Sequence, residues 1–121
     1  MFLSRRTKHA LLTIGIVLAL SQILFAHAIL MESTPKANST VSGPDIDITL
    51  RYNVRIDGGR SRVQLIAADG NVTTLTLAKQ TSPDVLQSKA AGLKAGAYKL
   101  KWNVLASDGH MSNGEVPFKV Q

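Results

Sequence analysis

The order of hydrophobic and polar residues divides the chain into two parts. Between Ala10 and Phe25, apolar residues follow one another almost without interruption. From Ile29 onward, short segments in which apolar and polar residues alternate are separated by Gly, Pro, Asn and Asp. Alternation with a period of two is typical of β-strands that bury one face, and the separating residues are typical of turns. The second part therefore predicts an all-β domain, and no segment in it has the period of a helix.

The clearest strand is the segment from Ala97 to Ala106, in which Tyr98 and Trp102 share one face with the other apolar residues. Pro117 cannot donate a hydrogen bond to a neighbouring strand, so the last strand is expected at a sheet edge or with a bulge. Seven short strands in residues 27–121 predict a two-sheet sandwich of immunoglobulin-like size. The predicted strands are Ile29–Ser33, Asp45–Tyr52, Ser61–Ala67, Asn71–Ala78, Val85–Ala90, Ala97–Ala106 and Gly114–Val120.

The first 26 residues have the composition of a secretory signal peptide. Three basic residues precede the apolar run, and no acidic residue occurs before Glu32. We therefore expect a signal peptide over residues 1–26 and one exported domain over residues 27–121, without stable membrane insertion after cleavage. The alternative is a retained anchor, because the apolar run up to Leu30 has the length of a membrane-spanning helix, about 20 residues. Both interpretations place the domain outside the cytoplasm.

Composition limits the kinds of partner and of chemistry. The chain has 14 basic and 8 acidic residues, and loss of the three basic residues in the signal would leave 11 against 8, a net charge of +3. This modest charge, without interleaved aromatic residues, does not indicate binding of nucleic acid. The sequence has no cysteine, which excludes thiol catalysis and thiolate metal sites. Without disulfides, burial alone must stabilise the domain.

Two histidines remain after the signal, His27 and His110. Asp108 precedes His110 by two residues, so in extended backbone both side chains point to the same side and could form half of a metal site. A surface histidine after an Asp-Gly turn is also common without any metal. If the mature chain began at His27, its α-amine and its imidazole Nδ1 could chelate one ion. Three nitrogens and one oxygen suit copper(II), and zinc would accept the same donors in tetrahedral geometry.

The residues around both histidines resemble those of the CopC family of periplasmic copper-binding proteins, called copper resistance proteins, and in particular its stand-alone members. The family begins its mature chain with histidine after alanine, here Ala26-His27, followed by Leu30, Ser33 and Pro35. It ends with a run that here reads LKAGAYKLKWNVLASDGHMSNGEVPFKV. The resemblance covers essentially the whole predicted domain.

The resemblance implies a seven-stranded Greek-key β-sandwich of immunoglobulin-like or cupredoxin-like form. It implies one copper(II) ion bound by His27, Asp108 and His110. It further implies a protein without catalytic activity, a carrier or sequestering protein in periplasmic copper homeostasis and resistance. The partners implied are the copper ion itself and an inner-membrane copper transporter of the CopD type.

The chain departs from the family in two places. Members often carry a Phe-Ser-Glu stretch whose glutamate lies near the copper site, and here the stretch is Tyr52-Asn53-Val54, without a carboxylate. The methionine-rich loop that binds copper(I) in some members is absent, since only Met31 and Met111 follow the initiator. We therefore predict a single copper(II) site and no dedicated copper(I) site, with Met111 as a candidate for a weak axial contact.

The predicted site depends on where the signal is cut. The small-x-small rule favours cleavage after Ala28, which would remove His27. The family resemblance favours cleavage after Ala26, which would make His27 the first residue, and we follow it.

Two other functions remain open. An N-terminal histidine with a second histidine also binds copper in oxidative enzymes that cleave polysaccharides. Against this, the aromatic residues that could dock a polymer all lie in predicted strands, and Asp108 would fill a copper position that oxygen chemistry needs. A metal-free envelope sandwich is the third possibility, expected if His27 is removed or if the signal stays attached.

Overall fold

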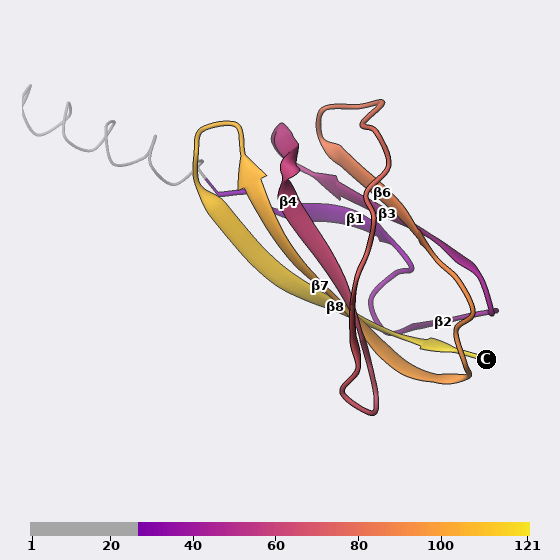
Figure 1. Cartoon of the computed structure of the whole chain (residues 1–121). Coiled ribbons are helices and arrows are strands. Elements are labelled where there is room, and N and C mark those ends of the chain that lie inside the picture. The colour runs from indigo at the N-terminus through magenta and orange to yellow at the C-terminus, as the bar shows by residue number, and fades with distance from the viewer. Residues whose placement is uncertain (1–26) are drawn as a thin grey trace, which may run out of the picture.

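The computed structural model describes residues 27–121, which form two β-sheets (Figure 1). The predicted signal peptide, residues 1–26, lies outside the described residues. Within residues 27–121 there is no helix that could cross a membrane. The eight strands are β1 (Leu30–Thr34), β2 (Ser39–Val41), β3 (Ile46–Tyr52), β4 (Ile56–Ala67), β5 (Val72–Thr74), β6 (Val85–Ala90), β7 (Gly96–Ala106) and β8 (Met111–Val120).

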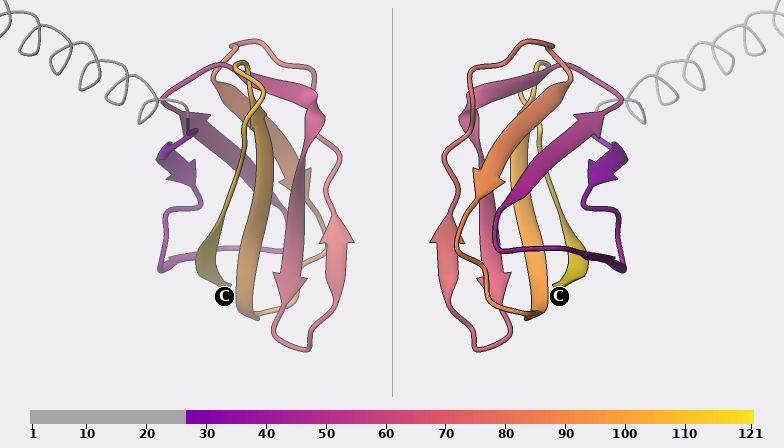
Figure 2. Two further views of the ribbon diagram at one scale, coloured as in Figure 1. Left: turned by 90° about the vertical axis from the view of Figure 1, so that its left-hand side faces the viewer. Right: turned by 90° about the vertical axis from the view of Figure 1, so that its right-hand side faces the viewer.

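The larger sheet has five strands in the order β2-β8-β7-β4-β5, and the smaller sheet has three in the order β1-β3-β6. Figure 2 shows β8, β7, β4 and β5 side by side in the larger sheet. Neighbouring strands are antiparallel except β2 and β8, which are parallel. The chain passes from one sheet to the other between most successive strands. Residues far apart in the sequence are therefore brought together at both ends of the sandwich.

The core lies between the two sheets and is formed by alternate residues of the strands. In β7, Leu100 and Trp102 are buried, while Lys99 beside them is exposed. Tyr52 of β3 packs edge-on against Trp102 across the core, with 5.3 Å between the ring centroids. Gly114 of β8 lies against the indole, and a Cβ at this position would collide with the Cζ2 of Trp102. The period of two in the sequence thus reports burial of one strand face.

The predicted two-sheet sandwich is confirmed, and each of the seven predicted strands is present with one additional strand. The additional strand is β2, whose three residues are too few to show alternation and whose partner β8 is distant in sequence. Two strands begin earlier than predicted, β4 at Ile56 and β8 at Met111. β5 ends earlier, at Thr74, because the chain then turns towards the smaller sheet, where the N–H of Ala78 donates to the carbonyl of Gln87 (2.8 Å).

The edge position predicted for Pro117 is confirmed for most of β8. Strand β2 pairs only with Phe118–Val120, so the preceding part of β8 has β7 as its single neighbour. The carbonyl of Pro117 points to the β2 side and accepts a hydrogen bond from the N–H of Asn38 (2.6 Å). Since N–H and C=O of one strand residue point to the same side, the missing N–H of Pro117 also faces this edge.

Candidate metal centre

The turn between β7 and β8 brings Asp108 and His110 together at one end of the sandwich. The N–H of Gly109 donates to the carbonyl of Ala106 (2.9 Å), and the N–H of Ala106 donates to the carbonyl of His110 (2.9 Å). Gly109 has a φ of +90°. A left-handed conformation costs a residue with a Cβ about 1–2 kcal/mol, so glycine favours this turn. The Asp-Gly-His sequence therefore forms this corner locally.

Both carboxylate oxygens of Asp108 contact His110. Oδ1 accepts a hydrogen bond from the backbone N–H of His110 (3.0 Å), and Oδ2 lies 3.2 Å from the ring Nδ1. The backbone hydrogen bond is the main cause that lowers the pKa of Asp108 below its ordinary value, and the imidazole adds to it. The carboxylate orients the ring through Nδ1, which leaves Nε2 of His110 as the nitrogen that can bind an ion.

Three hydrogen bonds fix the chain directly after His27. The N–H of Ala28 donates to the Oγ of Ser112 (3.1 Å), and the N–H of Ile29 donates to the Oδ1 of Asn53 (2.7 Å). The N–H of Asn53 donates in return to the carbonyl of Ile29 (3.1 Å). Ala28 is also buried in the core. We call residues 27–29 the His27 arm, and its backbone is attached to β8 and to the end of β3.

The arm brings the two histidines together. The rings of His27 and His110 have centroids 6.2 Å apart and planes tilted by 58°. If one ion were bound by a nitrogen of each ring at about 2 Å, it would lie about 3 Å from each ring centre. Two rings that share an ion can therefore be separated by about 6 Å at most. The observed separation is at this limit, so the two rings could share an ion only from opposite sides of it.

Side chains alone do not complete a metal site in the described part of the chain. Among residues 27–121, no group of three or more His, Asp or Glu side chains is arranged to hold an ion. The carboxylate of Asp108 is turned towards His110, as its two contacts show. The remaining nitrogen of the predicted site is the α-amine of His27, which would exist only in a chain cut after Ala26. His27, Asp108 and His110 are all exposed.

Sequence reasoning found the two histidines and Asp108 but not the residues that hold the arm. Asn53 drew attention only because a nearby family glutamate is missing, and Ser112 was not singled out. No local pattern marks either residue, because each meets the arm only after the sheets have formed. Met111, the candidate for a weak axial contact, is exposed beside His110, and Met31 is exposed in β1.

Comparison with known proteins agrees with the fold. The model of the CopC domain matches residues 30–121. Protein YobA of Escherichia coli K12 is 30% identical over 121 residues, which cover 98% of this chain and 95% of YobA. The copper transport protein CutJ of Bacillus subtilis is 23% identical over 119 residues, which cover 96% of this chain but only 22% of CutJ.

One solved structure has the same arrangement of sheets. PcoC, a methionine-rich copper resistance protein from Escherichia coli, is 25% identical with a TM-score of 0.69, over 79% of this chain and all of that chain (100%). The family model covers the entire sandwich, and the full-length relative covers nearly the whole sequence. The chain belongs to the CopC family of copper resistance proteins.

Proposed function

We propose that this protein binds one copper(II) ion through His27, Asp108 and His110 and carries or sequesters it outside the cytoplasm. The observation that carries the proposal is the 6.2 Å separation of the two imidazole rings, which belong to residues far apart in the sequence. Copper is here the cargo, and exposed ligands suit a protein that must take up and release an ion. Membership of a copper resistance family supports the choice of metal.

The proposed ligands have different tasks. His27 supplies its imidazole and, after cleavage behind Ala26, its α-amine, which together form a chelate. His110 supplies one of its ring nitrogens. Asp108 supplies the oxygen donor, and to do so its Oδ2, which lies 3.2 Å from Nδ1 of His110, turns from that ring nitrogen towards the ion. Three nitrogens and one oxygen form the tetragonal surroundings that copper(II) favours.

The His27 arm supports this proposal because it is already held in place. The backbone hydrogen bonds from Ala28 to Ser112 and between Ile29 and Asn53 limit the freedom of the first mature residue. A terminal residue is otherwise poorly ordered, and ordering it on binding would lower the affinity for the ion. The arm therefore favours tight binding by a chain that begins at His27.

We propose cleavage after Ala26 and a periplasmic location for residues 27–121. The eight strands and the core that the structure describes lie within residues 28–121, so a chain that begins at His27 keeps all of them. N-terminal sequencing of the exported protein tests the cleavage site. A mature chain that begins at Ile29, or a chain that keeps its leader, would contradict it.

An inner-membrane copper transporter of the CopD type is the proposed partner. The whole of this small domain aligns with about a fifth (22%) of CutJ, whose name is copper transport protein. A domain of this kind therefore also occurs as one part of a larger transport protein. Copper transfer from the loaded protein to membranes that contain such a transporter, compared with membranes that lack it, tests the partnership.

A copper enzyme that acts on polymers has little support from the aromatic residues. Tyr52, Trp102 and Phe118 are buried, and Tyr98 stacks on Phe118 with 5.8 Å between ring centroids. None of these four rings offers an exposed flat surface at the copper corner on which a sugar could stack. Hydrogen peroxide formation by the copper-loaded protein with a reductant tests the distinction, and a carrier should produce no more than copper bound to a simple peptide.

Competition titration against a copper(II) chelator tests the proposed site. We expect His27→Ala and His110→Ala to lower the copper(II) affinity by more than about 100-fold. Loss of a residue that only hydrogen-bonds to a metal ligand typically lowers the affinity by about 10- to 100-fold, and each of these two variants loses a ligand itself. Ser107→Ala, which changes an exposed side chain next to Asp108, is the matched control and should have a small effect. Equal affinities of the wild type and His27→Ala would remove the N-terminal histidine from the site.

A further inference from the structure

The outer faces of the two sheets differ in charge. On the larger sheet, β7, β8 and the part of β4 from Arg62 onward direct four cations and Glu115 outward, at positions that alternate with buried core residues. The cations are Arg62, Lys99, Lys101 and Lys119. Only Lys99 is near the acid, with 3.7 Å between its Nζ and the Oε2 of Glu115. At the start of β4, Asp57 faces the same side and lies 3.8 Å from Arg60, a pair that adds no net charge. This face, which we call the basic face, therefore has a net positive charge.

The outer face of the smaller sheet has balanced charges. Arg51 of β3 pairs with Glu32 of β1 at 2.9 Å, and Lys89 of β6 lies 4.0 Å from Asp47 of β3. Each of these cations has an acid beside it, so the two sheets present surfaces of different character. The excess positive charge of residues 27–121 is concentrated on the larger sheet.

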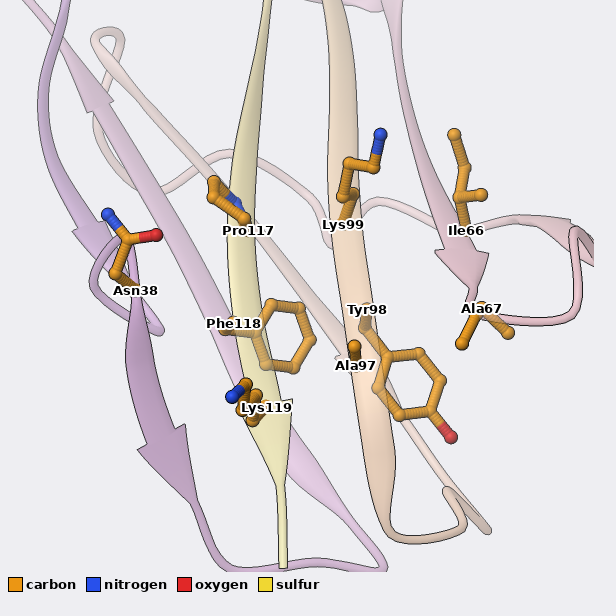
Figure 3. A pocket seen from close by; sticks show the side chains of 10 residues that line it. Asn38, Ile66, Ala67, Ala97, Tyr98, Lys99, Pro117, Phe118 and Lys119 are labelled. Atoms are coloured by element: carbon orange, nitrogen blue, oxygen red, sulfur yellow. The ribbon is translucent and has the colours of Figure 1, made fainter.

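The basic face also has an apolar hollow, with a volume of about 370 Å³. Figure 3 shows it across β8, β7 and β4, with Pro117 on one side, Ile66 on the other and Ala97 between them. Register pairs Ile66 with Lys99, Lys99 with Pro117, and Ala97 with Lys119, which places these residues on the same outer surface. The hollow is therefore apolar at its floor and flanked by two lysines.

We propose that the basic face docks on the surface of an anionic phospholipid bilayer. The four cations are spread over three neighbouring strands rather than gathered around one point, which fits an extended layer of charge better than a single small anion. Cations near an anionic bilayer and apolar area buried against it both favour such binding. The apolar hollow between the lysines supplies the apolar area that would be buried against the bilayer.

Docking in this way leaves the copper corner free. Lys99 lies near the start of β7, and the Asp108–His110 corner follows the end of β7 at Ala106. Seven strand residues at about 3.3 Å each separate Lys99 from that corner by roughly 20–25 Å. Arg62, the cation of the basic face nearest to the corner, pairs with Asn103, three residues before Ala106 and roughly 10 Å from it. The basic face would therefore hold the protein at the membrane while His27 and His110 remain accessible. This role adds a location to the proposed copper function and does not depend on it.

Vesicle sedimentation with the periplasmic protein tests the proposal. The vesicles contain phosphatidylcholine with or without phosphatidylglycerol. We expect binding only to the anionic vesicles, and weaker binding as salt is raised, because salt screens exposed charges. The variant Lys99→Gln/Lys101→Gln/Lys119→Gln should partition roughly 100-fold less, at about fivefold for each cation.

The control variant makes the same change of charge elsewhere. Arg51→Gln/Lys79→Gln/Lys89→Gln removes three cations from the smaller sheet and the segment beside it, and should retain the partition of the wild type. Equal losses in both triple variants would overturn the proposal, because net charge alone would then explain binding. So would failure of the wild type to bind anionic vesicles. If poly-glutamate instead bound with the same dependence on the basic face, the partner would be an acidic protein rather than a bilayer.

Copper titration separates this proposal from the copper site. The basic-face variant should bind copper(II) as tightly as the wild type, which also shows that it is folded. If the wild type bound anionic vesicles as expected but bound no copper, the proposed copper function would fail while the docking surface stood.

Discussion

The two halves of the proposed copper site are built in different ways. The corner that carries Asp108 and His110 is held mainly by hydrogen bonds within a few residues of one turn, with one long-range bond beside them, from the N–H of Ser107 to the carbonyl of Arg55 (3.0 Å). The His27 arm is held by Ser112 of β8 and by Asn53 at the end of β3, both distant in sequence. The corner is therefore a local structure, whereas the arm needs the assembled sandwich and the correct cleavage. The arm is the half through which folding and processing control copper binding.

The attachment of the arm is rigid because it continues from the core. Asn53 directly follows Tyr52, which is 1% exposed and packs against Trp102. The N–H of Tyr52 donates to the carbonyl of Asp84 (2.9 Å), which fixes the end of β3. The position of His27 is thus determined by residues that have no contact with an ion.

The largest effect is expected from moving the α-amine. A chain that begins at Ala26 keeps every side chain of the site but places a peptide bond where the amine of His27 would be. Its copper(II) affinity should be lower than that of a chain beginning at His27 by more than about 100-fold. Loss of a residue that only supports a metal ligand lowers the affinity by about 10- to 100-fold, and loss of an atom that binds the ion directly should lower it further. Competition titration measures the ratio. Equal affinities would mean that the arm contributes only its imidazole.

The next largest effect is expected from releasing the arm. Asn53→Ala/Ser112→Ala removes the side chains that accept from Ile29 and Ala28, and the copper affinity should fall by about tenfold or more. The control is Ser61→Ala, since the Oγ of Ser61 likewise accepts a backbone hydrogen bond, from Leu105 (3.0 Å), and not from a residue of the arm.

Titration and unfolding should be compared in the same variants. Asn53→Ala/Ser112→Ala and Ser61→Ala should both lower the free energy of unfolding, since each loses a partly buried hydrogen bond worth about 1 kcal/mol. Only the arm variant should lose copper affinity. A loss of affinity in Ser61→Ala of similar size would indicate that general loosening of the sandwich, rather than the arm, weakens binding.

A smaller effect is expected from strain in the local corner. Gly109 and Gly70 have φ values of +90° and +89°, and a Cβ at either would meet no atom within 4 Å. Gly109→Ala and Gly70→Ala should therefore both lower the free energy of unfolding by about 1–2 kcal/mol. Copper affinity should fall about fivefold in Gly109→Ala alone, since that strain acts on the turn between Asp108 and His110. An unchanged affinity would show that the corner tolerates displacement.

The smallest effect on copper is expected at Tyr52. Tyr52→Phe keeps the ring that supports Asn53, so affinity at neutral pH should not change. Burial raises the pKa of Tyr52 well above its ordinary value. The unfolded state loses this proton above about pH 10 while the folded state retains it, so the stability of the wild type should fall as pH rises beyond that point. Chemical unfolding across this range should show a weaker fall in Tyr52→Phe, and identical curves would contradict the assignment.

Most of the fold could be predicted because burial of one strand face leaves a period of two in the sequence. In β7 the alternation of Leu100 and Trp102 with lysines is visible without a structure. The start of β8 could not be predicted in this way, since Ser112 and Gly114 face inward without being large and apolar. Gly114 is small because the indole of Trp102 occupies the space beside it.

The candidate site was predictable only in its local half. Asp108 and His110 are two residues apart, so strand geometry alone puts their side chains on one side. That His27 lies beside them was expected only from the family resemblance, because no spacing rule connects the two ends of a domain. Asn53 and Ser112 could not be identified at all, since an Asn or Ser that accepts a backbone hydrogen bond has no signature until its partner is known.

The most direct test of the account is to count the histidine nitrogens on the ion. Electron paramagnetic resonance is measured on the mature protein with one equivalent of copper(II), once unlabelled and once with ¹⁵N-histidine. The account predicts three directly bound nitrogens, all of which change to ¹⁵N couplings on labelling, because the amine and ring of His27 and the ring of His110 all belong to histidine. A spectrum in which a single histidine nitrogen binds the copper would contradict the claim that the arm and the corner share one ion.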